Sequence, residues 1–245
     1  MYDRRLTVTK ALIIINVVVF MVGLMVQREA MLGISFPQAP KTSVFEITCA
    51  YSWFTCFLEG QFWRMVTYQF VHANFGHILF NMWALFFFGP AVENAMGPRR
   101  FLLFYLVCGI AGALFSSLLA GMGLYTSIPD TAQNEYICNQ LAAFAGFDGY
   151  VQCWQMIPLV GASASIYGVM VACAFMYPDV HISLLFPPVT LRLRTFAIII
   201  IGIASATILF NLGNAGGEAG HLGGIIMGAI IMAVWKYRSR YNQPW

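Results

Sequence analysis

Six long apolar segments limit this chain to a membrane fold. They lie near residues 11–26, 77–95, 101–122, 161–177, 195–212 and 220–237. A helix of about 20 apolar residues crosses a bilayer. A chain with 60% hydrophobic and only 9% charged residues would not remain soluble as a globular domain. We therefore predict an all-α polytopic membrane protein, a bundle of six transmembrane helices in one domain over residues 1–245, without a soluble appendage.

The basic residues predict the orientation of the bundle. If both termini are cytoplasmic, all 13 lysines and arginines except Arg28, Lys41 and Arg64 fall on inner segments, as the positive-inside rule requires. Basic residues precede the first apolar segment as in a signal peptide, but no small-residue cleavage site follows it, so we expect a retained helix. This N-in/C-in arrangement, with no Arg- and Ser-rich transit peptide, favours a bacterial inner (cell) membrane.

Two long connections, near residues 27–76 and 123–160, fall on the outer face in this arrangement. Long loops with structure of their own commonly carry function or act as lids. The aromatic residues of the first loop indicate that it lies partly in the membrane interface, whereas the role of the second loop is open. Both loops contain cysteines, which an oxidising compartment could pair as Cys49–Cys56 and Cys138–Cys153, although other pairings and four free thiols remain alternatives.

Four polar side chains stand inside the apolar segments, where they are expensive and usually functional: Ser163, His221, His77 and Asn81. Their chemical types are those of a serine hydrolase, with a nucleophile, a base and two donors for an oxyanion. The ordinary alternative is that the serine bonds to its own helix backbone and that the histidine only joins two helices. The prediction therefore depends on whether the four side chains meet.

Ser163 follows Gly161 and Ala162 at the start of the fourth segment. A helix over residues 161–177 would be only about 25 Å long, against about 30 Å of hydrocarbon. We expect this helix to begin below the outer surface, with Ser163 at the bottom of a wet cavity. The free backbone N–H groups of its first turn would then be available to an oxyanion.

The sixth segment has small residues at every fourth position, which lets two helices approach closely. These residues are Gly220, Gly224 and Gly228, and the fourth segment offers Gly161, Ala164 and Gly168 in return. The approach would bring His221 within hydrogen-bonding distance of Ser163. Tyr167, four residues after the serine, would pack on the imidazole. This geometry predicts an activated serine without a third member.

Three alternatives to this arrangement concern neighbouring residues. Ser165 is a rival nucleophile, but two residues along a helix turn a side chain by about 200°, so it would not face His221 together with Ser163. Glu218 is a candidate to orient His221, yet the glycine-rich stretch Gly213–Gly220 predicts a mobile lid and a solvated carboxylate. His77 and Asn81 are four residues apart on one helix face and are predicted to act as paired donors.

A metal site is the competing interpretation of three outer histidines, His72, His77 and His221. The sequence contains no H-E-x-x-H motif, and no carboxylate accompanies the three in the sequence pattern. We therefore predict neither a metal nor another cofactor. No basic patch or phosphate-binding loop is present either, so the expected partners are the lipid bilayer and membrane proteins, and not nucleic acid.

Taken together, these motifs resemble the rhomboid family of intramembrane serine proteases. The resemblance rests on Trp63-Arg64, the stretch His72 to Asn81, Gly161-Ala162-Ser163 and Gly220-His221 to Gly224, in family order over about residues 60–237. Each motif alone is weak, and their combination on the expected helices is specific. Ala164 and Gly220 depart from the residues common in the family, but both are small enough to keep the close packing.

The resemblance implies a rhomboid-like fold and an intramembrane serine endopeptidase that cleaves transmembrane protein substrates with a Ser163–His221 dyad. It also implies His77 and Asn81 as oxyanion donors, Tyr167, Gly161, Gly224 and His72 as supporting residues, and Glu93 as a structural carboxylate. A non-catalytic rhomboid-like binding or quality-control protein, a small transporter and a membrane-bound lipid hydrolase are the alternatives. The natural substrate, the cleavage site and the oligomeric state are not written in the sequence.

Overall fold

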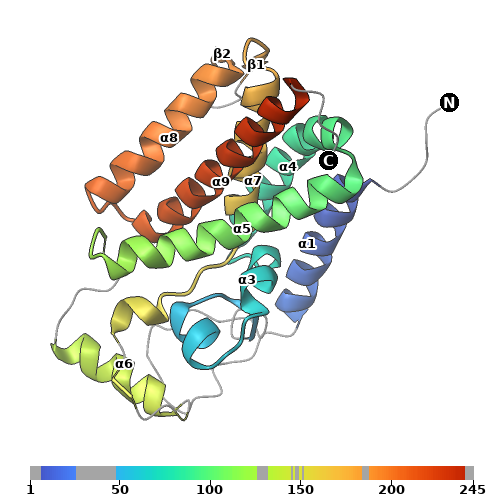
Figure 1. The fold of residues 1–245 in the computed structure, drawn as a ribbon. Helices are drawn as coiled ribbons and strands as arrows, with labels where there is room; N and C mark the ends of the chain where they lie inside the picture. The colour runs from blue at the N-terminus through green and yellow to red at the C-terminus, as the bar shows by residue number, and fades with distance from the viewer. Residues whose placement is uncertain are drawn as a thin grey trace.

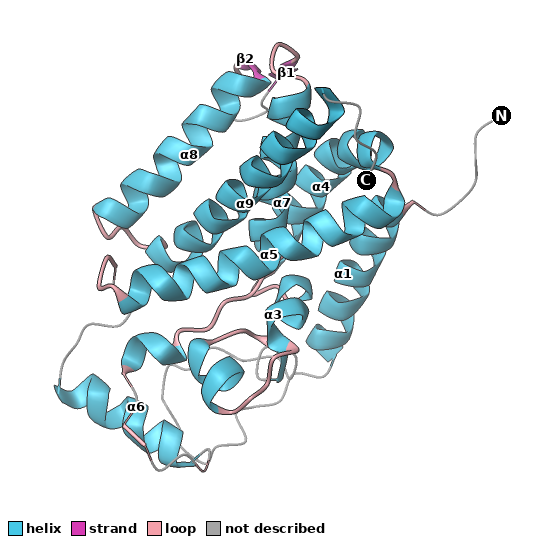
Figure 2. Ribbon diagram, viewed as in Figure 1, coloured by secondary structure: helices cyan, strands magenta, loops and turns pink. Residues whose placement is uncertain are grey.

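All six apolar segments form helices in the computed structural model, which describes residues 7–25, 48–125, 132–144, 146, 149–150, 152–183 and 188–240. The helices are α1 Val8–Met25, α4 Phe75–Met96, α5 Pro98–Gly121, α7 Ser163–Met176, α8 Leu193–Leu209 and α9 Ala215–Arg240 (Figures 1 and 2). The basic residues Arg4, Arg5, Arg28 and Lys41, which entered the prediction of orientation, lie outside the described residues.

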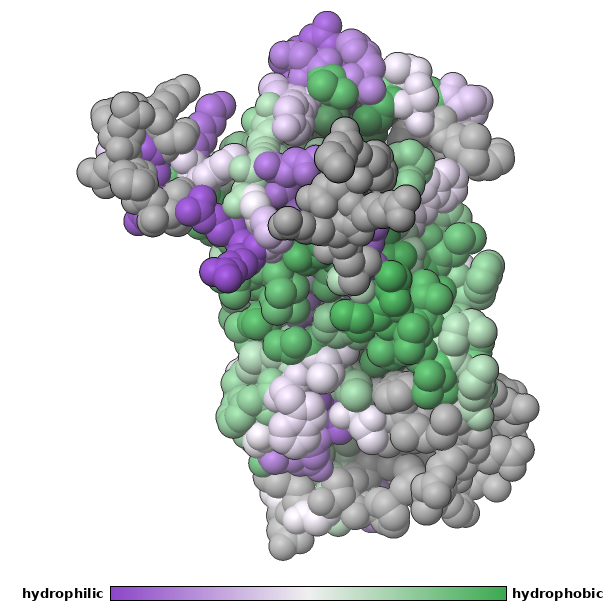
Figure 3. All heavy atoms as spheres, turned by 90° about the vertical axis from the view of Figure 1, so that its right-hand side faces the viewer, coloured by the Kyte–Doolittle hydropathy of each residue, from purple (hydrophilic) through white to green (hydrophobic). Residues whose placement is uncertain are grey.

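Four of these helices, α1, α4, α5 and α9, are long and apolar enough to cross a membrane, and α7 and α8 are shorter apolar helices. Apolar side chains form a band around the face seen in Figure 3, with hydrophilic residues above it. The chain is therefore an integral membrane protein built as a helical bundle, as predicted. Its six-span count and its N-in/C-in orientation stay predictions.

The centre of the bundle is α9, which packs against α5, α7 and α8, while α4 packs against α1, α5 and α7 (Figure 1). Glycines make the contact between α7 and α9 very close. A Cβ on Gly224 would overlap the carbonyl oxygen of Ala164, and one on Gly228 would lie 2.9 Å from the Cα of Gly168. The small-residue stripe thus brings the two backbones together, which fixes the side chains that face each other at the N-terminal ends of α7 and α9.

A carboxylate of α4 holds the first turn of α1. Glu93 accepts hydrogen bonds from the backbone N–H of Val8 at 2.7 Å and of Thr9 at 2.8 Å, and from the Thr9 hydroxyl at 2.6 Å. The first N–H groups of a helix have no partner within it. Glu93 accepts two of them, and the Thr7 hydroxyl accepts a third, the N–H of Lys10, at 3.3 Å. Glu93 is buried, which agrees with the structural role that the resemblance implied.

The two long connections, before α4 and before α7, are structured in their described parts. The first contains the π-helix η1 Phe54–Leu58, the short helix α3 Arg64–Thr67 and the 3-10 helix η2 Tyr68–Phe70. The second contains α6 Ala132–Phe144 and the 3-10 turn η3 Cys153–Met156. Cys138 and Cys153 form a disulfide between α6 and η3, whereas Cys49 and Cys56 are free thiols, so only one of the two suggested pairs forms.

A small antiparallel hairpin, which the sequence did not predict, joins α7 to α8. Its strands are β1 His181–Ser183 and β2 Thr190–Arg192, with Ile182 opposite Leu191. Asp179 lies within 3.7 Å of Arg192 and 3.3 Å of Arg194 at the base of the hairpin. The hairpin lies at the end of the bundle opposite to α6 (Figure 1) and therefore takes no part in the site described next.

Candidate active site

Ser163 is the first residue of α7, and the loop that delivers it is held from two sides. The N–H of Gly161 donates to the Tyr68 carbonyl at 2.9 Å, and the N–H of Ala162 lies 3.5 Å from His72 Nε2. Gly161 has a φ of 117°, a conformation that favours glycine, and a Cβ there would lie 2.6 Å from the His77 ring. Gly161 and His72 therefore position the start of α7 and take no direct part in the serine's hydrogen bond.

His72 is suited to accept the hydrogen bond from the Ala162 N–H because its imidazole is neutral. Burial, with a smaller effect from His77, lowers the pKa of His72 to about 3, and only 5% of the residue is exposed. A neutral imidazole keeps one ring nitrogen without a proton, which is required for Nε2 to accept. The state of His72 is thus constant across the physiological pH range.

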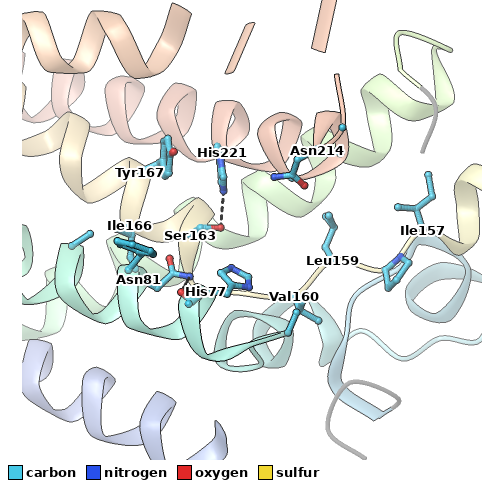
Figure 4. A pocket seen from close by; sticks show the side chains of 18 of the residues that line it. His77, Asn81, Ile157, Leu159, Val160, Ser163, Ile166, Tyr167, Asn214 and His221 are labelled. Atoms are coloured by element: carbon cyan, nitrogen blue, oxygen red, sulfur yellow. Dashed lines mark hydrogen bonds between the residues drawn. The ribbon is translucent and has the colours of Figure 1, made fainter. Parts of the chain in front are cut away.

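Ser163 and His221 come together across the close α7–α9 contact. The serine Oγ lies 2.8 Å from His221 Nε2, a hydrogen-bond distance (Figure 4). The ring of Tyr167 stacks on the imidazole with 4.1 Å between centroids and 8° between planes. The geometry inferred from the helix spacing is therefore present, and it is the geometry that a histidine needs to remove the serine proton.

Glu218 is not the solvated charge that the glycine-rich sequence suggested. Its Oε2 lies 3.0 Å from His221 Nδ1, and the two side chains are only 16% and 13% exposed. The prediction for Glu218 was wrong because it placed this residue in a loop. Helix α9 begins at Ala215 and not at residue 220, so Glu218 and His221 stand three residues apart on one helix face. Residues 215–220 of the predicted lid are therefore helical, and only Gly213 and Asn214 stand before α9, where they line the cavity.

His77 and Asn81 line the same cavity from α4, together with Ser163 and His221. Asn74 caps this helix by accepting the N–H of His77 at 2.9 Å, which places the imidazole in the first turn. The Asn81 amide donates to the His77 carbonyl at 3.0 Å, which leaves its second N–H for another acceptor. Both side chains stand on the α4 side of Ser163 (Figure 4), where the resemblance placed oxyanion donors.

Ser165, the rival nucleophile, faces away from His221. Its hydroxyl donates to Gln69 Oε1 at 2.9 Å, and the residue is fully buried. Gln69 in turn belongs to η2 of the first outer connection. Ser165 therefore joins α7 to that connection and does not line the cavity.

The cavity has a volume of about 710 Å³ and reaches from the bundle interior to the two long connections, which contribute Ala73 and Ile157–Val160. One of its walls is the segment Ile157–Val160, which sequence reasoning missed because it carries no polar side chain. Leu159 pairs with Tyr51 as an isolated antiparallel bridge, through bonds of 2.7 and 3.0 Å, so the segment is held extended (Figure 4). The site thus combines a polar floor with an apolar, extended wall.

A helical membrane protein with a serine, an imidazole and a carboxylate aligned beside an internal cavity is the class that this fold and site define. The chain belongs to the rhomboid family, because the Rhomboid domain model of that family matches residues 59–238. This match includes every residue of the site. The family resemblance noted from the motifs is confirmed.

The chain is similar to proteins named as proteases and to one named as inactive. It is 28% identical to Rhomboid protease AarA of Providencia stuartii over 175 residues, which cover 71% of this chain and 56% of AarA. It is 29% identical to Rhomboid protease GluP of Bacillus subtilis over 170 residues, 69% of this chain and 25% of GluP. Inactive RHOMBOID-like protein 8 of Arabidopsis thaliana is 32% identical over 79 residues, 32% of this chain and 26% of that protein. The chain therefore spans only a quarter to somewhat over half of these relatives.

Proposed function

We propose that this protein is an intramembrane serine endopeptidase that hydrolyses peptide bonds in or near the transmembrane segments of other membrane proteins. The observation that carries the proposal is the 2.8 Å contact between Ser163 Oγ and His221 Nε2 at the floor of a cavity inside the bundle. The names of AarA and GluP support the same class of activity. We further propose that the domain spans the whole chain, with six helices crossing an inner bacterial membrane N-in/C-in, so that the cavity opens to the outer face.

In the proposed reaction, a substrate segment that has unwound enters the cavity and its carbonyl carbon is attacked by Ser163 Oγ. His221 Nε2 takes the hydroxyl proton and then gives it to the leaving amine, which releases the first product. Water attacks the resulting ester with the same histidine as base, and the histidine returns the proton to Ser163 Oγ as the ester bond breaks. The second product leaves with a new carboxyl group, and the dyad is restored. The extended wall Ile157–Val160 offers backbone groups beside the path of an unwound chain.

The negative oxygen that forms during this attack needs donors. The first N–H groups of α7 have no partner inside that helix, and the positive end of its dipole favours a negative charge there. His77 and Asn81 add side-chain donors from the opposite wall. Removal of one such donor raises the barrier, because the donors stabilise a charge that develops only as the transition state forms.

We expect His77→Ala and Asn81→Ala each to lower kcat by about 10- to 1,000-fold, less than loss of the serine, because several donors share the charge. The measurement is single-turnover cleavage of a membrane-protein substrate by purified variants. Leu79→Ala is the matched control on the same helix, since Leu79 is 46% exposed on the outside of the bundle. Wild-type rates in both donor variants would remove them from the oxyanion site.

The serine's activation is tested directly with a fluorophosphonate probe, which labels only an activated serine hydroxyl. The detergent-solubilised wild type is expected to label covalently, and Ser163→Ala and His221→Ala to lose the label. Mass spectrometry of the labelled peptide identifies the modified residue. A folded wild type that stays unlabelled would instead favour a non-catalytic rhomboid-like binding protein, and one plant relative is itself named inactive.

A further inference from the structure

Glu218 is the one charged side chain in contact with the proposed dyad among the described residues. Its carboxylate meets the imidazole nitrogen of His221 that Ser163 does not use, with 3.0 Å on one side of the ring and 2.8 Å on the other. When the serine hydroxyl donates to Nε2, the neutral imidazole carries its proton on Nδ1. An ionised carboxylate has no proton to donate, so Glu218 accepts from Nδ1. The three groups therefore form a chain of hydrogen bonds with one consistent set of proton positions.

We infer that Glu218 is the third member of a Ser163–His221–Glu218 triad, in which it positions and polarises the histidine. The inference rests on the proposed function and adds a residue to it. When Ser163 attacks, its proton moves to Nε2 and the Nδ1 proton stays on the ring. The imidazole becomes positively charged and Glu218 remains ionised, so their attraction lowers the energy of the charged state. Glu218 touches only the histidine and is a positioning residue.

The position of Glu218 on the helix also has a simpler explanation. A carboxylate in the first turn of α9 interacts favourably with the positive end of the helix dipole, whatever lies beside it. That role requires no contact with His221, and exposed side chains perform it equally well. The simpler explanation does not account for the partial burial of Glu218 or for its contact with His221 Nδ1. The two roles also differ in a measurable way, because only the triad changes how activity depends on pH.

Among the described residues, few other titratable groups face His221. His77 approaches from α4, and Ser163 and Tyr167 approach from α7, where Tyr167 is also within electrostatic range of Glu218. On the α5 side, Ser116 binds the Gly216 carbonyl and the Tyr125 hydroxyl. The charged residues of α5 and α8 are Arg99, Arg100 and Arg194, at the ends far from His221. The wall Ile157–Val160 has no titratable side chain. Glu218 is thus the anionic group that acts on the imidazole.

The test is Glu218→Gln, which keeps the shape and an acceptor oxygen but removes the charge. We expect kcat to fall by about 10- to 100-fold, less than in triads without a stacked ring, because Tyr167 still holds the imidazole plane. The acid limb of the pH–rate profile should move to lower pH. The sign follows from the charge: without its anionic neighbour the imidazole binds a proton less readily, so the neutral base persists in more acidic solution.

Two further variants separate charge from structure. Glu218→Asp keeps the carboxylate, so its acid limb should remain near that of the wild type even if the shorter side chain lowers the rate. Glu135→Gln makes the same chemical change in α6, far from the cavity, where the carboxylate accepts a hydrogen bond from Tyr150. This variant should leave both kcat and the pH–rate profile unaltered. An acid limb and a kcat in Glu218→Gln equal to those of the wild type would overturn the inference.

A measurement on the wild type covers the case in which Glu218→Gln does not fold. The chain has 4 histidines, so ¹⁵N-histidine labelling gives few signals, and the one lost in His221→Ala belongs to the proposed base. We expect its neutral form to carry the proton on Nδ1, and a proton on Nε2 would overturn the triad. If the wild type neither cleaves nor takes the fluorophosphonate label, the proposed function fails. If it does both while the Glu218 tests fail, only the triad is wrong.

Discussion

Ser163→Ala is expected to reduce proteolysis by about 10⁴-fold or more and to leave the fold intact. The hydroxyl is the proposed nucleophile, and none of the groups around it can form the acyl intermediate in its place. The change removes one oxygen at the floor of a cavity, so the helix packing around it is undisturbed. The measurement is cleavage of a reconstituted membrane-protein substrate in liposomes, together with thermal unfolding of the purified variant.

Ser165→Ala is the matched control two residues along the same helix. Its loss breaks the buried hydrogen bond to Gln69, which should lower stability by about 1–2 kcal/mol while the remaining folded protein still cleaves. The reverse pattern, with activity kept in Ser163→Ala and lost in Ser165→Ala, would move the nucleophile and contradict the site proposed above.

Gly224→Ala is expected to cause the second largest loss, through packing and not through chemistry. The new methyl group would overlap the backbone carbonyl of Ala164, and a backbone cannot move aside as a flexible side chain can. Helices α7 and α9 must separate, so we expect about 2–3 kcal/mol of destabilisation. A shift of about 1 Å between Ser163 and His221 would further reduce the rate by about 100-fold. Thermal unfolding and the fluorophosphonate labelling rate measure the two effects.

Gly202→Ala in α8 is the control for replacing a helical glycine. A Cβ there meets no atom within 4 Å, so the substitution adds no clash. Alanine favours a helix over glycine by about 1 kcal/mol, so stability should be equal or slightly higher. Equal behaviour of Gly202→Ala and Gly224→Ala would contradict the role of close α7–α9 packing.

The apolar segments predicted the six helices because hydrophobicity over 15 or more residues is a strong signal. The start of α9 was misplaced because glycines normally indicate a loop. Here the glycines at the start of α9 are helical and lie against α5, where the Ser116 hydroxyl donates to the Gly216 carbonyl at 3.1 Å. That error concealed Glu218, since its relation to His221 exists only when residues 215–221 are helical.

Other features of the structure could not be predicted from the amino-acid sequence. The strands β1 and β2 have three residues each, too few for an alternating pattern to show. The wall Ile157–Val160 is extended because Leu159 pairs with the distant Tyr51, a contact that no local sequence pattern encodes. The approach of Ser163 to His221 could be predicted, because the spacing of small residues along a single helix can be read directly from the sequence and indicates which face packs closely.

The bond between Glu93 and the start of α1 has a consequence for how the protein is made. The cap is 84 and 85 residues away from the groups it satisfies, and synthesis runs from the N-terminus. Helix α1 is therefore made before the carboxylate that holds Val8 and Thr9, and only 22% of its apolar window is covered by the rest of the bundle even in the finished fold. While the chain is being made, α1 therefore has to hold its place without this carboxylate, and Glu93 can fasten its first turn only after α4 has followed.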